Sequence, residues 1–178
     1  MHHDPSTAEC LFDRAAIDSL MDAQASQLNI RYAQIRPLVL CVMTGALVYA
    51  GQLLPRLNFA LDLDYVHASR YGDARTGGVL DWIVRPRYDV RGREILLLDD
   101  ILDEGVTLNE IRMWLLAAGA ARVEIAVLTH KEKPVPQPCI PDYPALMTPD
   151  RYVYGFGLDV AGLWRNANGI FVATDTAE

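Results

Sequence analysis

The sequence predicts an α/β protein in which a parallel core sheet is flanked by helices on both faces. Two apolar runs, at 95–98 and 123–128, read as buried strands, and an amphipathic stretch at 108–118 lies between them. Two parallel strands need such a crossover helix. The chain has 178 residues, of which 51% are hydrophobic and 22% charged, enough for one globular domain with its own core. We therefore expect a single domain over residues 1–178.

The elements before this unit follow from the spacing of apolar residues. Residues 11–28 carry apolar side chains at helical spacing. The apolar run at 38–43 predicts a buried strand, and a helix is expected at 46–57. After the central unit, Gly119 is placed to end the helix, and the proline-rich stretch 134–149 is expected to be loop or turn.

A hairpin is expected in the middle of the chain. Within 61–67, the apolar residues Leu61, Leu63 and Tyr65 alternate with Asp62 and Asp64, which predicts a strand whose acids face solvent. A second strand is expected at 79–84. The intervening residues 70–78 are polar and rich in glycine, as in a long hairpin or a flexible flap.

Charge and cysteine content exclude several classes of partner. The formal net charge is -7 and the pI is about 5.0, which argues against tight nonspecific binding to nucleic acid but leaves a local basic patch open. Cys10, Cys41 and Cys139 fit neither a disulfide framework nor a zinc site, as is usual for cytoplasmic proteins. We see no signal peptide and no apolar window long enough to span a membrane, so we expect a cytoplasmic protein without a membrane partner.

The segment from Ile95 to Thr107 carries the chemistry. Its strand runs into Asp99 and Asp100, and a turn with Asp103 and Gly105 precedes the helix. Ligands of open α/β sheets bind at the carboxyl ends of strands. Amide groups at the helix start can bind a phosphate, to which Thr107 adds a hydroxyl. Asp99 and Asp100 suit ribose hydroxyls or Mg²⁺, and Asp103 could transfer a proton.

A purely structural interpretation of this segment also exists. Thr107-Leu108-Asn109-Glu110 has the pattern of a capping box. Asp99 and Asp103 could be acids that favour a turn and a helix start. The complete string argues against this interpretation, because three acids after a buried strand are costly without a ligand.

The string resembles the phosphoribosyl pyrophosphate signature of type I phosphoribosyltransferases, and other segments are similar to the hypoxanthine-guanine branch of that family. The resemblance covers about residues 38–173. It implies that Asp99 and Asp100 hold the ribose hydroxyls and that Asp103 is a general acid/base near N7 of the purine. It also implies a 5-phosphate site made by Glu104, Gly105, Val106 and Thr107.

The same resemblance assigns roles to residues elsewhere. Thr44 and Gly45 would contact pyrophosphate. Arg70 and Tyr71 would lie at the start of the mobile flap and bind phosphoribosyl pyrophosphate. Lys131 would bind the purine O6. The remaining implied roles are base stacking by Tyr152, backbone contacts from Val153, a second Mg²⁺ at Asp159 and pyrophosphate binding by Arg165.

Some of these residues also have ordinary structural interpretations. Lys131 could lie on a solvated charged edge, and Tyr152 could be part of the core. Asp159 could cap a helix, and the role of Arg165 could be limited to an ion pair with an acid.

Three positions depart from the family pattern. Thr44 replaces a lysine, Arg70 replaces a serine and Glu104 replaces a threonine. A carboxylate close to a 5-phosphate would repel it, so we expect the Glu104 side chain to turn outward while its amide still donates.

The resemblance implies a Mg²⁺-dependent enzyme of purine salvage. It would join hypoxanthine or guanine to the ribose 5-phosphate of phosphoribosyl pyrophosphate, and it would form a homodimer or homotetramer. A small hood would come from the N-terminal segment and about 134–178. Two alternatives stay open: another acceptor base, such as xanthine or a pyrimidine, or a non-catalytic sensor of phosphoribosyl pyrophosphate. The acidic pI counts against a sensor that acts on nucleic acid.

Overall fold

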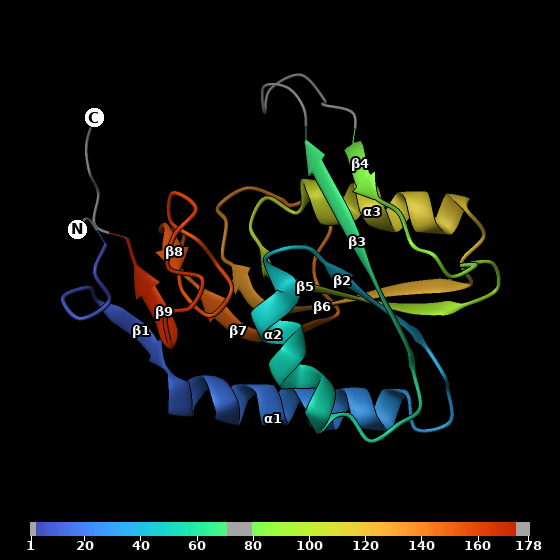
Figure 1. Ribbon diagram of the computed structural model, residues 1–178, viewed down its shortest axis with the longest axis horizontal. Helices are drawn as coiled ribbons and strands as arrows, with labels where there is room; N and C mark the ends of the chain where they lie inside the picture. The colour runs from blue at the N-terminus through green and yellow to red at the C-terminus, as the bar shows by residue number, and fades with distance from the viewer. Residues whose placement is uncertain (1–2, 71–79, 174–178) are drawn as a thin grey trace.

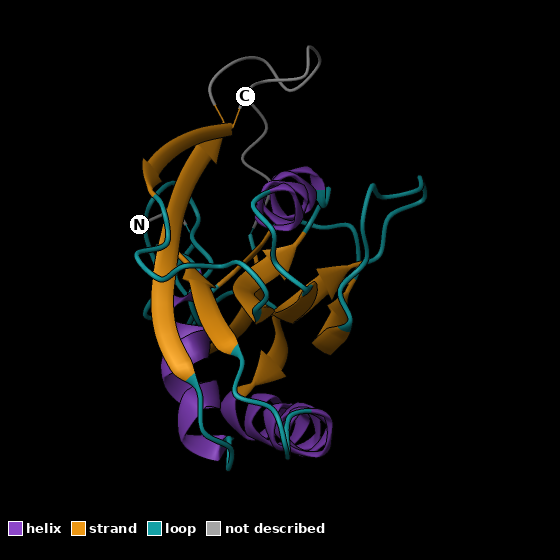
Figure 2. Ribbon diagram, turned by 90° about the vertical axis from the view of Figure 1, so that its right-hand side faces the viewer, coloured by secondary structure: helices purple, strands orange, loops and turns teal. Residues whose placement is uncertain are grey.

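The computed structural model describes residues 3–70 and 80–173, which form a central sheet between two layers of helices (Figures 1 and 2). The six strands of this sheet lie in the order β4-β3-β2-β5-β6-β7. Their bounds are β2 Leu38–Val42, β3 Asp62–Arg70, β4 Leu80–Val84, β5 Glu94–Leu102, β6 Arg122–Lys131 and β7 Tyr143–Thr148. Helices α1 (Arg14–Arg31) and α2 (Ala46–Leu53) cover one face, and α3 (Val106–Ala117) covers the other.

Five strands of the sheet run parallel, and the edge strand β4 is antiparallel to β3. The predicted fold class is therefore confirmed, with one antiparallel strand added at the edge. That strand follows from the expected hairpin, since Arg70, the last residue of β3, pairs with Leu80, the first residue of β4. Of the expected flap, 70–78, residues 71–78 lie outside the described part of the chain.

The core strands are apolar on both faces because helices cover both sides of the sheet. All five residues of β2 are buried. In β5, Leu96 and Leu98 pack with α1 and α2, whereas Ile95 and Leu97 pack with α3. The sheet thus has two hydrophobic layers that hold its carboxyl ends in a fixed arrangement.

A second, three-stranded sheet lies beside the first, near both ends of the described chain (Figure 1). It has the order β1-β9-β8 and joins β1 (Cys10–Asp13), β9 (Gly169–Val172) and β8 (Val153–Tyr154). We call this sheet the hood. Its position brings the turn after β8 to the carboxyl edge of the main sheet.

Several predicted boundaries were wrong. The helix predicted at 11–28 begins only at Arg14, because residues 10–13 form β1 and Asp13 caps the helix by accepting a hydrogen bond from the Ala16 amide. The helix predicted at 46–57 ends at Leu53 and continues as a 3₁₀ turn, Leu54–Arg56, where Pro55 lacks an amide donor. The predicted loop at 134–149 contains β7. Pro144 is tolerated in this strand because β7 lies at the edge of the sheet, where no further strand needs an amide donor.

The predicted orientation of β3 was reversed. Asp64 is buried, with its carboxylate accepting hydrogen bonds from the Arg87 and Tyr88 amides. Leu63 and Tyr65 are 47% and 39% exposed. Alternation identified the strand correctly, but polarity gave the wrong face because backbone donors satisfy the buried acid.

Among the helices in the described ranges, none has the length and apolar character needed to cross a membrane.

Candidate active site

The candidate site lies where β2, β5 and β6 end, because parallel strands bring their carboxyl ends to one edge. β5 continues to Leu102, beyond the predicted run at 95–98, so Asp99 and Asp100 belong to the strand itself. Asp103 follows that strand directly, and Lys131 is the last residue of β6. Residues far apart in the sequence therefore meet at this edge.

The turn from β5 into α3 has the geometry of an anion site. Gly105 adopts a left-handed conformation, with φ of 76°, and Val106 begins the helix without a side-chain cap. The capping-box interpretation of Thr107–Glu110 was therefore wrong, and no side-chain oxygen caps the first amides of α3. Such amides can bind phosphate oxygens.

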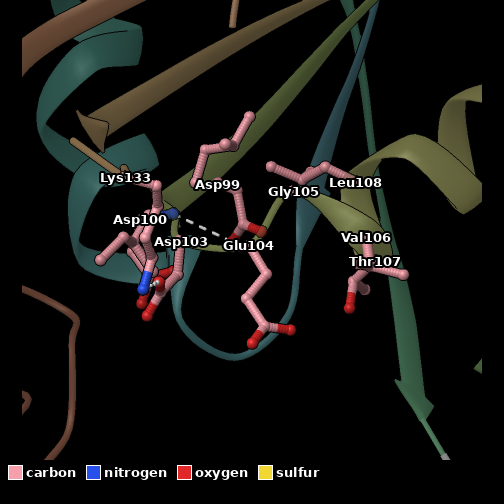
Figure 3. Close-up of a pocket in the computed structure, with 11 residues that line it drawn as sticks. Asp99, Asp100, Asp103, Glu104, Gly105, Val106, Thr107, Leu108 and Lys133 are labelled. Atoms are coloured by element: carbon pink, nitrogen blue, oxygen red, sulfur yellow. Dashed lines mark hydrogen bonds and ion pairs between the residues drawn. The ribbon is translucent and has the colours of Figure 1, made fainter. Parts of the chain in front are cut away.

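A cavity of about 390 Å³ opens in front of this turn (Figure 3). Residues 99–108 and Lys133 line it, so every residue predicted on this segment to bind phosphoribosyl pyrophosphate is at the cavity wall. The Glu104 side chain is exposed, and Glu104 also lines this cavity (Figure 3). The expected orientation of its carboxylate away from a 5-phosphate stays a prediction.

Asp99 and Asp100 are an electrostatically unfavourable pair. Asp100 is 8% exposed, and the Asp99 carboxylate accepts a hydrogen bond of 2.9 Å from the Asp100 amide. Burial raises the pKa of both carboxyls, and the charge of Asp100 raises that of Asp99 further. The nearest guanidinium atom of Arg165 is 3.9 Å from Asp100. The pair would therefore gain from a cation or hydroxyl donors in the cavity.

Two glycines bring the other segments of the site close to Asp100. A Cβ atom at Gly45 would overlap the Asp100 carboxylate, and one at Gly157 would lie 2.6 Å from the Gly45 carbonyl oxygen. Gly45, after β2, is thus in contact range of Asp100, and the turn after β8 packs on Gly45. Only residues without side chains allow this approach at the two positions.

A second cavity, of about 180 Å³, adjoins the first. All four residues predicted to bind the purine line it: Lys131, Tyr152, Val153 and Asp159. Asp100, Ile101 and Asp103 border both cavities. Tyr152 is 55% exposed, so it is not an ordinary core residue.

Asp103 stands between two lysines at this border. Its Oδ2 is 2.6 Å from Lys131 Nζ, and its Oδ1 is 2.7 Å from Lys133 Nζ. Burial opposes the charge on Asp103, but the two ammonium groups outweigh that effect, and the pKa of the carboxyl is below its usual value. The Lys131 side chain is only 8% exposed, so it does not belong to a solvated edge.

Asp159 and Arg165 form a pair at the far side of the smaller cavity. Arg165 Nη2 is 2.5 Å from Asp159 Oδ1, and Arg165 Nη1 donates to the Gly157 carbonyl. Asp159 also accepts a hydrogen bond from the Gly162 amide, so it stabilises a turn rather than capping a helix. Arg165 does pair with an acid, yet it remains within 3.9 Å of Asp100. Its pyrophosphate role stays a prediction.

The structure does not show whether two of the predicted residues reach the site. The backbone of Arg70 ends β3 and pairs with Leu80, the first residue of β4. Tyr71 lies outside the described residues.

Two residues of the site were missed. Lys133 contacts Asp103, and the Gln137 side chain donates hydrogen bonds to the carbonyl oxygens of Asp103 and Lys131. Gln137 also bonds to the His130 ring. Lys133 had a signal, since it shares a short charged run with Lys131, whereas Gln137 stands in a proline-rich loop with no pattern of its own.

A family model named phosphoribosyl transferase domain matches residues 9–155 of the chain. The chain belongs to this phosphoribosyltransferase family. The matched range includes both hydrophobic layers, the acidic turn after β5 and Lys131.

Similar proteins carry related names. The chain is 32% identical over 140 residues to the hypoxanthine-guanine phosphoribosyltransferase of Lactococcus lactis, covering 78% of this chain and 76% of that protein. It is 28% identical over 157 residues to the hypoxanthine-guanine-xanthine phosphoribosyltransferase of Tritrichomonas foetus, covering 88% and 86%. A hypoxanthine phosphoribosyltransferase structure from Trypanosoma cruzi superposes with a TM-score of 0.87 at 25% identity, covering 95% of this chain and 97% of that one. This phosphoribosyltransferase thus shares its fold with enzymes of purine salvage.

Proposed function

We propose that this phosphoribosyltransferase transfers the 5-phosphoribosyl group from phosphoribosyl pyrophosphate to hypoxanthine or guanine, giving IMP or GMP and pyrophosphate. The observation that carries the proposal is the pair of adjoining cavities that meet at Asp100 and Asp103. One has acids and a helix start, which suits a ribose phosphate. The other has a lysine and a tyrosine, which suits a flat base with a carbonyl group.

The larger cavity would bind the sugar phosphate. The uncapped amides of α3 and the Thr107 hydroxyl would donate to the 5-phosphate, and Gly105 permits its close approach. Asp99 and Asp100 would accept hydrogen bonds from ribose hydroxyls, which would offset the cost of burying two adjacent carboxylates. Glu104 is exposed, and an outward orientation of its side chain would keep its charge away from the phosphate.

The smaller cavity would select a 6-oxopurine. Lys131 Nζ can donate to a carbonyl oxygen at position 6, whereas adenine presents an amino donor there and would lose that hydrogen bond. Tyr152 would stack on the base. Asp103 borders both cavities, so its carboxylate is placed to hold or move the proton at N7 while N9 bonds to the ribose.

The donor set fits Mg²⁺. Asp99, Asp100 and Asp159 offer carboxylate oxygens at the two cavities, and burial raises the pKa of the adjacent pair despite Arg165 at 3.9 Å from Asp100. In the part of the chain that the structure describes, no three acidic, histidine or cysteine side chains converge on one point. This suits a cation that takes one or two carboxylates and completes its coordination with substrate oxygens. When bound, it would neutralise charge on the pyrophosphate leaving group.

The test is an assay of the purified protein with phosphoribosyl pyrophosphate and Mg²⁺, offering hypoxanthine, guanine, xanthine, adenine and uracil separately. We expect turnover of hypoxanthine or guanine that a chelator abolishes and excess Mg²⁺ restores. No turnover of any base, together with measurable binding of phosphoribosyl pyrophosphate, would favour the sensor. Turnover of uracil alone would indicate a pyrimidine enzyme.

Xanthine is a second candidate acceptor. The relative from Tritrichomonas foetus has xanthine in its name. Xanthine shares the 6-oxo group that Lys131 would contact, so this residue does not exclude it. The same assay ranks the three oxopurines.

We further propose a cytoplasmic homodimer or homotetramer. Three free cysteines, Cys10, Cys41 and Cys139, support a reducing compartment. Leu47, Leu63 and Tyr65 are exposed around a cavity of about 300 Å³, and a second copy of the chain would bury this apolar surface. Sedimentation of the wild type and of Leu63→Glu would test the assembly.

A further inference from the structure

The lysines of this chain are confined to one place. The sequence has two lysines, Lys131 and Lys133, and fourteen arginines. Both lysines contact the same carboxylate, that of Asp103, and each binds a different oxygen of it. The other surface ion pairs of the described residues use arginine, for example Arg56 with Asp18 and Arg93 with Asp62.

The two lysines differ in what else they contact. Lys131 borders the smaller cavity and has no second carboxylate partner among the described residues. Lys133 borders the larger cavity, and its Nζ is also 2.6 Å from Asp150 Oδ1. Lys133 therefore bridges Asp103 to Asp150, which comes just before the hood strand β8.

The contact between Lys131 and Asp103 conflicts with the proposed role of Lys131. To donate to a base in the smaller cavity, Lys131 Nζ has to give up part of its interaction with Asp103. Without another cation, Asp103 would then be a partly buried carboxylate close to the Asp99–Asp100 pair. Its charge would be less favourable and its position less fixed.

We propose that Lys133 is a positioning residue that holds the Asp103 carboxylate in place while Lys131 turns from Asp103 to the purine. The inference rests on the proposed function. Asp150 anchors Lys133, so that Lys133 does not follow the base or the phosphate. A lysine suits this task, because its ammonium group is a compact charge with three donors that can serve two carboxylates at once.

The backbone of Asp103 is held by a hydrogen bond that does not involve either lysine side chain. Gln137 donates to the Asp103 carbonyl oxygen and to that of Lys131. Hence the main chain at Asp103 is fixed independently of its side chain. Loss of Lys133 should release the carboxylate without displacing the turn.

Steady-state kinetics of Lys133→Met and Lys131→Met separate the two roles. We expect Lys133→Met to lower kcat about tenfold or more through misplacement of Asp103, with the KM for hypoxanthine changed less than twofold. Lys131→Met should instead raise the KM for the base. Lys133→Arg should recover part of kcat. Arg151→Met is the matched control. Arg151 follows Asp150 in the chain but pairs with Glu9, so its loss breaks a neighbouring ion pair and should leave kcat unchanged.

The possible outcomes are distinct. If wild-type protein turns over no base, the proposed function fails and Lys133 is not at issue. If the wild type is active and folded Lys133→Met keeps its kcat within twofold, Lys133 is merely structural and the inference is wrong. A rise in the KM for base that equals that of Lys131→Met would also overturn it. If Lys133→Met does not fold, Asp150→Asn, which keeps both lysines, decides: kcat should fall, and an unchanged kcat rejects the role.

The two lysines also give a direct structural test. A sample labelled only at lysine gives two side-chain NMR signals, which the Met variants assign. On addition of IMP, which carries the 6-oxopurine, the Lys131 signal should shift and the Lys133 signal should stay in place. Equal shifts of both signals would contradict the division of roles.

Discussion

The two ends of the central sheet treat buried acids in opposite ways. At the amino end, Glu124 accepts a hydrogen bond of 2.7 Å from the Tyr32 hydroxyl and lies 3.0 Å from the Arg31 guanidinium, which also holds Glu94. At the carboxyl end, Asp99 and Asp100 are adjacent, and the Arg165 guanidinium is 3.9 Å away from Asp100.

The pKa values differ accordingly. Burial opposes the charge of Glu124, but the Tyr32 hydroxyl and Arg31 outweigh it and lower the pKa of that carboxyl. Burial dominates at Asp99 and Asp100 and raises the pKa of both. Glu124 has its partners within the chain, whereas burial of Asp99 and Asp100 is not offset by partners of comparable strength, which leaves this pair to be satisfied by a ligand.

The largest effect is expected at the site. Asp103→Asn removes the proposed proton-transfer group but keeps the size of the side chain. We expect kcat to fall by about a hundredfold or more, since general acid–base catalysis contributes on that order. The Kd for phosphoribosyl pyrophosphate, measured by calorimetry, should change little. An unchanged kcat would remove Asp103 from the mechanism.

The matching change at the amino end should act on stability alone. Glu124→Ala leaves the Tyr32 hydroxyl and one side of Arg31 without an acceptor, and it should lower the free energy of unfolding by about 3 kcal/mol. Urea unfolding measures this loss. The kcat of the folded fraction should match the wild type; a loss of activity would mean that the two ends are not independent.

A smaller effect is expected at Lys131. Replacement by methionine would remove the proposed charged hydrogen bond to the base, worth about 1.5–3 kcal/mol, so the KM for hypoxanthine should rise roughly ten- to hundredfold. The KM for phosphoribosyl pyrophosphate should stay nearly constant. Equal rises in both would argue against direct contact with the purine.

The smallest effect has the opposite sign. Asp99→Asn removes an unfavourable buried charge, and it should raise the free energy of unfolding by about 1 kcal/mol at neutral pH while reducing activity, as at other strained sites. Mg²⁺ with phosphoribosyl pyrophosphate should raise the Tm of the wild type more than that of the variant. A destabilised variant would show that the Asp99 contact with the Asp100 amide outweighs the repulsion.

The two ends should also respond oppositely to acid. The Asp99 pKa is raised on folding, so its unfavourable contribution is complete above the raised value and vanishes below the ordinary value of about 4. The gain from Asp99→Asn should therefore shrink as the pH falls toward 4. The Glu124 pKa is lowered, so its favourable contribution is present above the ordinary value of about 4.5 and is lost as the pH falls through the lowered value. Unfolding curves between pH 3 and 8 check both trends.

The sequence predicted those parts of the fold and site that are local in the chain. The buried strands and the α3 helix follow from apolar spacing, and the acidic turn after β5 is one continuous string. The face of β3 was wrong because Asp64 is satisfied by amides more than twenty residues away. β7 was missed because its proline lies on an edge strand, a position that depends on the finished sheet.

The missed site residues share a reason. Lys133 and Gln137 act through contacts with Asp103, and Lys133 also contacts Asp150, across 17 to 34 positions of sequence. The charged run placed Lys133 near Lys131 but did not indicate these partners, and the proline-rich loop gave no sign of the contacts of Gln137. The resemblance to a family supplied Lys131, Tyr152, Val153 and Asp159, and the structure places them around one cavity.

The confinement of lysine to the Asp103 cluster has a chemical consequence. Acylating agents, aldehydes and reducing sugars attack primary amines, and apart from its α-amino group this chain offers them only Lys131 and Lys133, whose side chains are 8% and 17% exposed. The guanidinium groups that cover its surface stay protonated and are poor nucleophiles toward such reagents. Inactivation that follows the modification of lysine would then report on the Asp103 cluster itself, and a bound nucleotide would slow it.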